Sequence, residues 1–83
     1  MQIVYFARVR EAIGFEGEAA DLPADIVTIA DCLDHLIARG GVYPAAFADR
    51  AKLRFALDQQ MAAVDTPIGT AQELAIFPPV TGG

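Results

Sequence analysis

The chain is short, acidic and strongly apolar, with 83 residues and a formal net charge of −5. Its length allows one small domain, and with 54% hydrophobic residues it is too apolar to be disordered. The negative charge makes nucleic acid and anionic membranes poor partners, whereas a basic partner surface would suit it.

The first predicted element is a strand over residues 2–9, where β-branched and aromatic residues dominate. Both of its faces are partly apolar, which favours a central strand or a face that meets a partner. Residues 10–17 are expected to form a turn, because Gly14 and Gly17 allow backbone angles that other residues avoid. A weak second strand is expected over residues 18–22, before Pro23.

A helix over residues 29–39 is the clearest local signal. Its apolar residues recur at helical spacing and predict one buried stripe, made of Ile29, Leu33, Leu36 and Ile37. Thr28 can cap the N-terminus, with Asp31 three residues later as in a capping box. Gly40 and Gly41 are expected to end the helix.

Further strands are predicted over residues 52–57, 61–64 and 73–77, with a turn at 58–60 and a short helical turn over 44–50. The order β-β-α-β-β-β predicts an α+β fold, a mixed sheet with one main helix packed across one face. We expect residues 1–77 to form this domain and residues 78–83 to form an extended tail.

The tail reads Pro78–Pro79–Val80–Thr81–Gly82–Gly83. Two prolines directly after an apolar strand make a stiff exit, and the four following residues can reach roughly 13–14 Å when extended. Glycines can thread a narrow channel, so the pattern predicts a stem that carries a bare carboxylate into another protein's pocket. Adenylation by ATP would activate that carboxylate, and a sulfur nucleophile could then displace AMP and leave a thiocarboxylate.

The remaining chemistry-bearing residues point away from catalysis by this chain. Cys32 and His35 are the only residues of their types, which excludes a disulfide and a Cys/His metal cage, and Cys32 is interpreted as a core side chain. We see no phosphate loop and no nucleophile–base pair, so ATP must bind a partner. Met1 leads directly into the first strand without a signal peptide or membrane span, and a lone cysteine fits a reducing compartment, so we expect a cytoplasmic protein.

The segment Leu74–Gly83, together with Val4–Glu11 and Gly14, resembles the small subunit of molybdopterin synthase. The likeness covers nearly the whole chain and is most specific in the last ten residues. It implies a β-grasp, ubiquitin-like fold. It also implies no bound cofactor or metal and no catalytic side chains in this chain.

The resemblance further implies a sulfur carrier. Gly83, next to Gly82, would be adenylated by an activating enzyme that uses ATP in trans, and then converted to a thiocarboxylate. The sulfur would pass to precursor Z to form the dithiolene of molybdopterin, in a heterotetramer with two large subunits. By position, the residues expected at the partner interface are Phe6, Arg10, Phe77, Pro78, Pro79, Val80 and Thr81.

Two segments depart from the family pattern. The family usually has Gly-Asp-Glu before the last strand, where this chain has Ala71–Glu73, and often Asn-Gln after the third strand, where this chain has Asp58–Gln59. Both departures lie away from the tail, so we expect them to change turn geometry more than function.

Three other functions fit the same tail. A carrier for thiamine thiazole synthesis has the same fold and glycines, but is usually shorter and lacks the Phe-Pro-Pro stem. A ubiquitin-like modifier would need the same adenylation and would form isopeptide bonds with lysines. A plain binding module would tolerate residues appended after Gly83, which a carrier would not.

Overall fold

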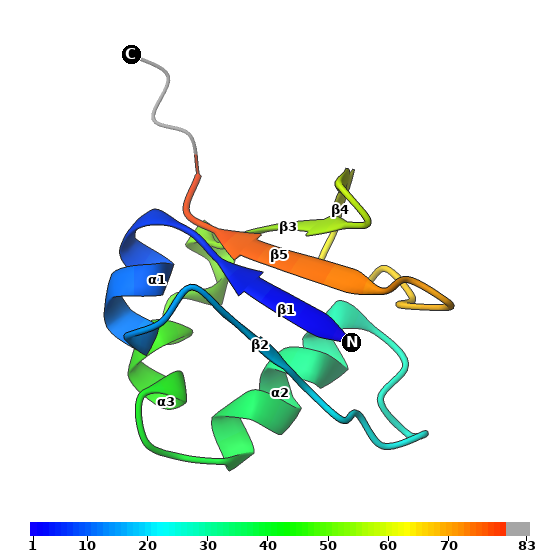
Figure 1. The fold of residues 1–83 in the computed structure, drawn as a ribbon, viewed down its shortest axis with the longest axis horizontal. Coiled ribbons are helices and arrows are strands. Elements are labelled where there is room, and N and C mark those ends of the chain that lie inside the picture. The colour runs from blue at the N-terminus through cyan, green and yellow to red at the C-terminus, as the bar shows by residue number, and fades with distance from the viewer. Residues whose placement is uncertain (80–83) are drawn as a thin grey trace.

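Five strands form one mixed sheet in the computed structural model, which describes residues 1–79. Their order across the sheet is β2-β1-β5-β3-β4, and β1 and β5 run parallel at its centre while the other neighbours are antiparallel. Figure 1 shows β1 and β5 side by side and pointing the same way. The strands are β1 (Gln2–Tyr5), β2 (Gly17–Ala19), β3 (Arg54–Leu57), β4 (Gln60–Ala62) and β5 (Glu73–Phe77).

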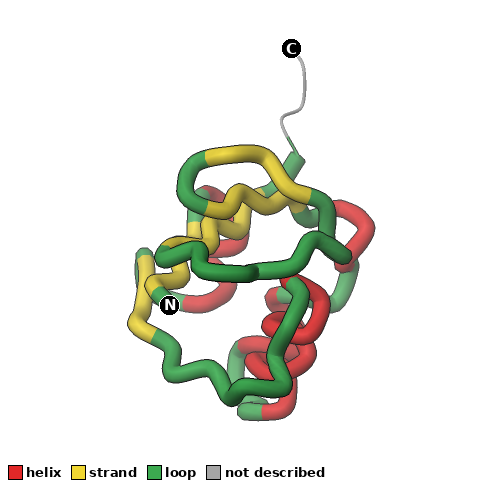
Figure 2. The backbone as a smooth tube through the Cα atoms, turned by 90° about the vertical axis from the view of Figure 1, so that its right-hand side faces the viewer, coloured by secondary structure: helices red, strands yellow, loops and turns green. Residues whose placement is uncertain are grey.

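The helices gather on one face of this sheet, as Figures 1 and 2 show from two directions. They are α1 (Ala7–Ile13), α2 (Ile29–Ala38), α3 (Tyr43–Ala46) and the single 3₁₀ turn η1 (Arg50–Lys52). The α+β class, with a mixed sheet and one main helix across it, is therefore confirmed. No helix in residues 1–79 is long and apolar enough to cross a membrane.

The strand predicted over residues 2–9 is wrong beyond Tyr5, and so is the turn predicted to begin at residue 10. The chain turns at Ala7, whose φ is 51°, and continues as α1 to a left-handed C-cap at Gly14. Val9 and Ile13, four residues apart, supply the buried side of this helix. The strand was predicted too long because β1 and the start of α1 join without a polar break.

The main helix α2 begins and ends close to where the sequence predicts. The Thr28 hydroxyl accepts from the Asp31 N–H at 3.1 Å, and Asp31 Oδ2 accepts from the Thr28 N–H at 3.1 Å, which completes the capping box. Asp31 Oδ2 also accepts from the Val27 N–H at 3.0 Å. These bonds satisfy N–H groups that have no partner within the helix.

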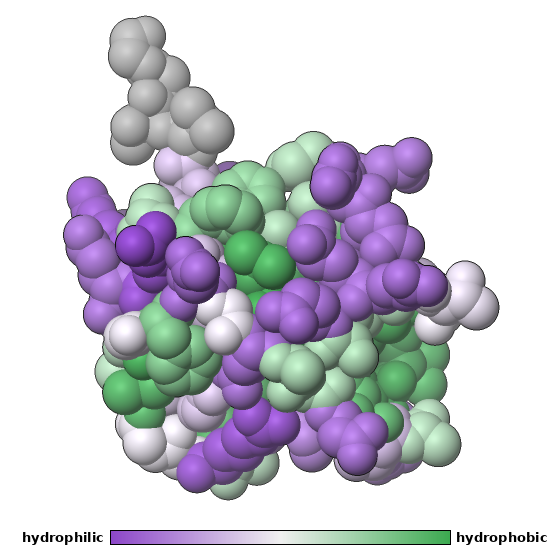
Figure 3. Space-filling view, in the orientation of Figure 1, coloured by the Kyte–Doolittle hydropathy of each residue, from purple (hydrophilic) through white to green (hydrophobic). Residues whose placement is uncertain are grey.

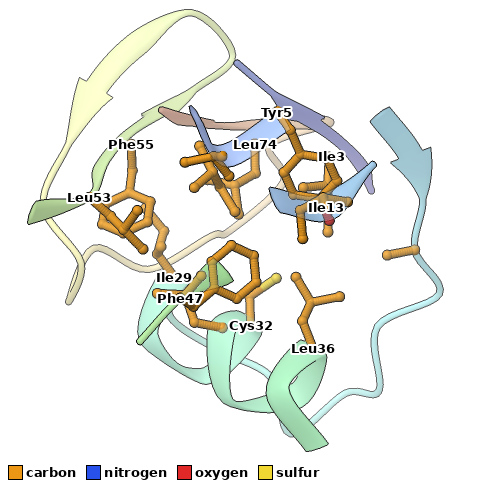
Figure 4. Close-up of a cluster of buried hydrophobic side chains, with 14 of the residues drawn as sticks. Ile3, Tyr5, Ile13, Ile29, Cys32, Leu36, Phe47, Leu53, Phe55 and Leu74 are labelled. Carbon is orange, nitrogen blue, oxygen red and sulfur yellow. The ribbon is translucent and has the colours of Figure 1, made fainter. Parts of the chain in front are cut away.

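The core lies between the sheet and the helices. Figure 4 shows side chains from β1, β3 and β5 pointing toward those of α1 and α2 and toward Phe47, which directly follows α3. Members with no exposed surface include Ile3, Ile29, Leu33, Leu36, Leu74 and Ile76. Cys32 is fully buried among them, which confirms its interpretation as a core side chain.

The remaining predicted elements lie near their expected places with shifted ends. The second strand is Gly17–Ala19 rather than 18–22, β4 is Gln60–Ala62 rather than 61–64, and the predicted helical turn is split between α3 and η1. Two residues, Asp58 and Gln59, with φ of 47° and 70°, join β3 to β4 in a tight hairpin.

Asp58 also shapes the approach to β5, where the chain departs from the family pattern. Its Oδ1 accepts from the backbone N–H groups of Gln72 and Glu73 at 2.9 and 3.0 Å. An aspartate in this turn therefore supports the Ala71–Glu73 segment directly. The altered turn is held by hydrogen bonds that join it to the β3–β4 hairpin.

A polar network ties the edge strand β2 to the rest of the fold. Glu18 accepts from the Tyr5 and Tyr43 hydroxyls at 2.8 and 2.6 Å and pairs with Arg39 at 3.0 Å. Burial first, and then the hydrogen bond to Glu18, raise the pKa of both tyrosines. The network thus links β1, β2, α3 and the end of α2 through one carboxylate.

Candidate functional site

The parallel pairing of β1 and β5 brings two aromatic residues to the same edge of the sheet. Tyr5 lies opposite Ile76, so Phe6 directly follows β1 where Phe77 ends β5. The Phe6 N–H donates to the Ile76 carbonyl at 3.2 Å and continues the pairing past the strand. Residues 71 positions apart in the sequence therefore meet where the chain leaves the sheet.

Phe6 and Phe77 pack edge to face, with ring centroids 6.5 Å apart and planes at 84°. Phe6 is nevertheless 49% exposed, although an aromatic side chain normally gains by burial. The left-handed turn at Ala7 sends the chain away into α1 directly after Phe6. The pair is a half-covered aromatic surface of the kind that partner proteins bury.

Arg10 lies one helical turn along α1 and is exposed. With Phe6, Val4 and Glu16 it lines a hollow of about 210 Å³ between β1, β2 and α1. A guanidinium can pair with a carboxylate or stack on an aromatic ring while its stem covers apolar surface. The structure thus brings Arg10 to the same edge as the aromatic pair.

Pro78 and Pro79 follow Phe77 and are partly buried. With Phe6 and Phe77 they line one end of a groove of about 910 Å³ that continues between α1 and α3. The structure therefore brings together five of the predicted site residues: Phe6, Arg10, Phe77, Pro78 and Pro79. The other predicted site residues, Val80, Thr81, Gly82 and Gly83, lie outside the described residues.

The sheet face away from the helices carries a row of apolar and small residues that sequence reasoning missed. The strand registers place Val4, Ala75, Ala56 and Met61 side by side across β1, β5, β3 and β4. Met61 is 68% exposed, and Phe77 lies two residues beyond Ala75 on this face. Figure 3 shows apolar surface near the end of β5 with hydrophilic surface on both sides. Alternation within each strand indicates which of its residues share a face of the sheet. Only the strand order shows that these four residues lie side by side.

The described side chains offer little chemistry of their own. Burial raises the pKa of the Cys32 thiol to about 11, which keeps it from being a ready nucleophile. Within residues 1–79, no three His, Cys, Asp or Glu side chains lie close enough to hold a metal ion. What this edge of the molecule offers is a surface for recognition.

Comparison with known proteins links this geometry to one family. A model described as the ThiS family matches residues 3–83. The molybdopterin synthase sulfur carrier subunit of Escherichia coli is 35% identical over 83 residues, covering 100% of this chain and 99% of the relative. The protein of the same name from Haemophilus influenzae is 32% identical over the same lengths.

Solved structures with the same fold include two archaeal proteins. The crystal structure of SAMP1, the small archaeal modifier protein 1 of Haloferax volcanii, has a TM-score of 0.73 and 28% identity, with 100% of this chain and 98% of that one covered. A putative molybdopterin converting factor subunit 1 from Pyrococcus furiosus has a TM-score of 0.72 at 22% identity and 95% coverage of both chains. These likenesses confirm the expected ubiquitin-like β-grasp fold.

Proposed function

Because this chain belongs to the ThiS family, we propose that it is the sulfur-carrier subunit of a molybdopterin synthase. Its two bacterial relatives carry that name and match it from end to end. The observation that carries the proposal is the convergence of Phe6, Phe77 and the two prolines at the point where the sequence continues to Gly82–Gly83.

The reactive group in this proposal is the C-terminal carboxylate of Gly83. It attacks the α-phosphate of ATP within an activating enzyme, and pyrophosphate leaves. A sulfur nucleophile then attacks the acyl carbon and displaces AMP, leaving a thiocarboxylate. The carrier gives this sulfur to precursor Z, where it becomes part of the molybdopterin dithiolene. ATP stays on the activating enzyme, and this chain supplies only the acyl group.

The aromatic edge supports the same proposal as a docking surface. The large synthase subunit and the activating enzyme both have to hold the domain while the tail occupies a pocket. A half-exposed aromatic pair beside an arginine is the composition that protein interfaces favour at their centre. We propose a heterotetramer with two copies of each subunit, located in the cytoplasm.

A ubiquitin-like modifier is the second candidate, because SAMP1 of Haloferax volcanii shares the fold over nearly its whole length. A modifier and a carrier share the adenylated carboxylate and differ in what attacks it next. A lysine amine gives an isopeptide bond, whereas a sulfur donor gives a thiocarboxylate. The thiazole carrier undergoes the same activation as the proposed one and gives its sulfur to a different acceptor.

Appending one alanine after Gly83 tests the role of the terminus. The proposal predicts that the extended protein binds the large subunit through its folded domain but forms no molybdopterin from precursor Z. The unmodified chain, after activation, should form product with molybdopterin synthase and not with thiazole synthase. Full activity of the extended protein would contradict the carrier mechanism. Stable lysine adducts of the unmodified chain, without sulfur transfer, would favour a modifier.

A further inference from the structure

The charges of this acidic molecule are segregated. Around the point where β5 leads into Pro78, four cationic side chains outnumber the two acidic ones, Glu16 and Asp49, that line the hollow and the groove there. Arg54 lies opposite Phe77 in the β3–β5 pairing, and Arg8 and Lys52 lie on the two sides of the groove below the aromatic pair. Arg10 occupies the neighbouring hollow with Phe6. Four of the six cationic residues of the chain therefore surround the base of the tail.

Acidic residues occupy the opposite end of the sheet, where β5 begins. Asp58 holds the N–H groups of Gln72 and Glu73 there, and Glu73 opens the strand. Asp21 lines a separate hollow at the same end, together with Met1 and Ala71. The charge balance around the base of the tail therefore differs from the net charge of −5 of the whole chain.

The groove between α1 and α3 combines this positive rim with an apolar interior. Exposed Ala45 and Ala48 contribute small side chains to its lining, and buried Leu53 also lines it. Arg8 makes no ion pair with any of residues 1–79, and Lys52 reaches only Asp49, at 3.6 Å with 78% of its side chain exposed. Arg8 and Lys52 thus flank apolar surface, and only Lys52 is paired, in a weak and solvated ion pair with Asp49 of the groove lining.

We propose that this groove docks a segment of the large synthase subunit that carries carboxylates beside apolar side chains. The inference rests on the proposed function and names the chemistry of its partner. A stable interface buries about 800 Å² on each side, which a short tail alone does not supply. Pro78 and Pro79 line one end of the groove together with Phe6 and Phe77, so the groove is continuous with the aromatic surface at the base of the tail.

Paired substitutions of the two rim cations test the proposal. Arg8→Gln with Lys52→Gln removes two positive charges, and the matched control Ala24→Glu with Thr70→Glu makes the same change in net charge at exposed positions far from the groove. Affinity for the cognate large subunit is measured at low and high salt, after thermal unfolding has shown that each variant folds. We expect the rim variant to bind about tenfold more weakly at low salt and to lose most of the wild-type salt dependence.

A second variant tests the groove by shape without changing charge. Ala45→Trp fills it from an exposed position, and the affinity for the large subunit should fall by about tenfold or more. Equal binding by wild type, the rim variant and Ala45→Trp would overturn the proposal, as would equal weakening by the control pair. Wild-type self-association that is lost in Ala45→Trp would assign the groove to a second copy and also overturn it.

These experiments distinguish failure of the proposed function from failure of the groove proposal. If the wild-type chain acquires no thiocarboxylate from a competent activating enzyme, the proposed function fails whatever the affinities are. If the thiocarboxylate forms and both the rim variant and Ala45→Trp bind the large subunit as tightly as wild type, only the groove proposal fails.

Discussion

At the scale of single residues, the exposure of Phe6 is the clearest departure from what stability alone would favour. Half of this large apolar side chain lies in water beside Phe77, although the core is well filled. The left-handed backbone of Ala7, which is costly for a residue with a Cβ, fixes the chain direction directly after Phe6. The exposure of Phe6 therefore fits a role in partner recognition better than a role in folding.

Phe6→Ala should therefore weaken binding more than folding. We expect at least about a tenfold loss of affinity for the large subunit, because buried aromatic anchors dominate interfaces. The free energy of unfolding should fall by only about 1 kcal/mol, the value of one aromatic pair. Calorimetric titration and urea unfolding give the two numbers.

Phe15→Ala is the matched control for Phe6→Ala. Phe15 is 43% exposed and also packs edge-on against an aromatic residue, Tyr5, at 6.0 Å, but it lines neither the groove nor the hollow beside the tail. Its loss should lower stability to a similar degree and leave the affinity unchanged. Equal loss of affinity in both variants would show that Phe6 acts through stability.

At the scale of elements, the start of α2 shows local chemistry that the sequence alone could predict. Hydrogen bonds from the Thr28 and Val27 backbone hold the pKa of Asp31 below its usual range. The charged form is therefore favoured by folding. Its contribution is present above the ordinary pKa of aspartate and is lost as the pH falls through the lowered value.

Thr28→Ala should lower the free energy of unfolding by about 1 kcal/mol at neutral pH, as other lost N-caps do. Asp31→Asn should make the free energy of unfolding depend less steeply on pH below the ordinary aspartate pKa. Urea midpoints measured from neutral pH down to the acid range test both. An acid limb in Asp31→Asn as steep as in wild type would contradict this assignment.

Local signals predicted α2, β5 and the fold class, but not α1. The capping residues and the helical stripe of α2 are read within one short window, and so is the apolar run that ends at Pro78. The switch from β1 to α1 depends on one left-handed residue, Ala7, which composition does not favour. Tertiary packing of Val9 and Ile13 against the core selects that turn.

At the scale of the whole molecule, the sequence predicted the members of the site better than their neighbours. Phe77, Pro78 and Pro79 are adjacent in the chain, so they were found together. The row from Val4 to Met61 and the rim of Arg8 and Lys52 depend on strand order and helix placement, which no local pattern contains. The net charge was a poor guide to the surface around the tail for the same reason, because the fold decides which charged residues lie together.

The Glu18 network should matter for the stability of the whole fold, because it joins four elements. Tyr43→Phe removes one donor to a carboxylate and should lower the free energy of unfolding by about 1–2 kcal/mol. The raised tyrosine pKa values keep both hydroxyls protonated, so the contribution is present below the ordinary tyrosine pKa and is lost as the pH rises further. Urea unfolding at neutral and alkaline pH tests this, and an unchanged midpoint in Tyr43→Phe would contradict it.

If Gly83 carries sulfur as a thiocarboxylate, the intact mass of the wild-type chain should change after incubation with ATP, a cognate activating enzyme and a sulfide source. We expect a gain equal to replacing one oxygen atom by sulfur, located at Gly83 by fragmentation. An unchanged mass, with the same enzyme active on another carrier, would contradict it.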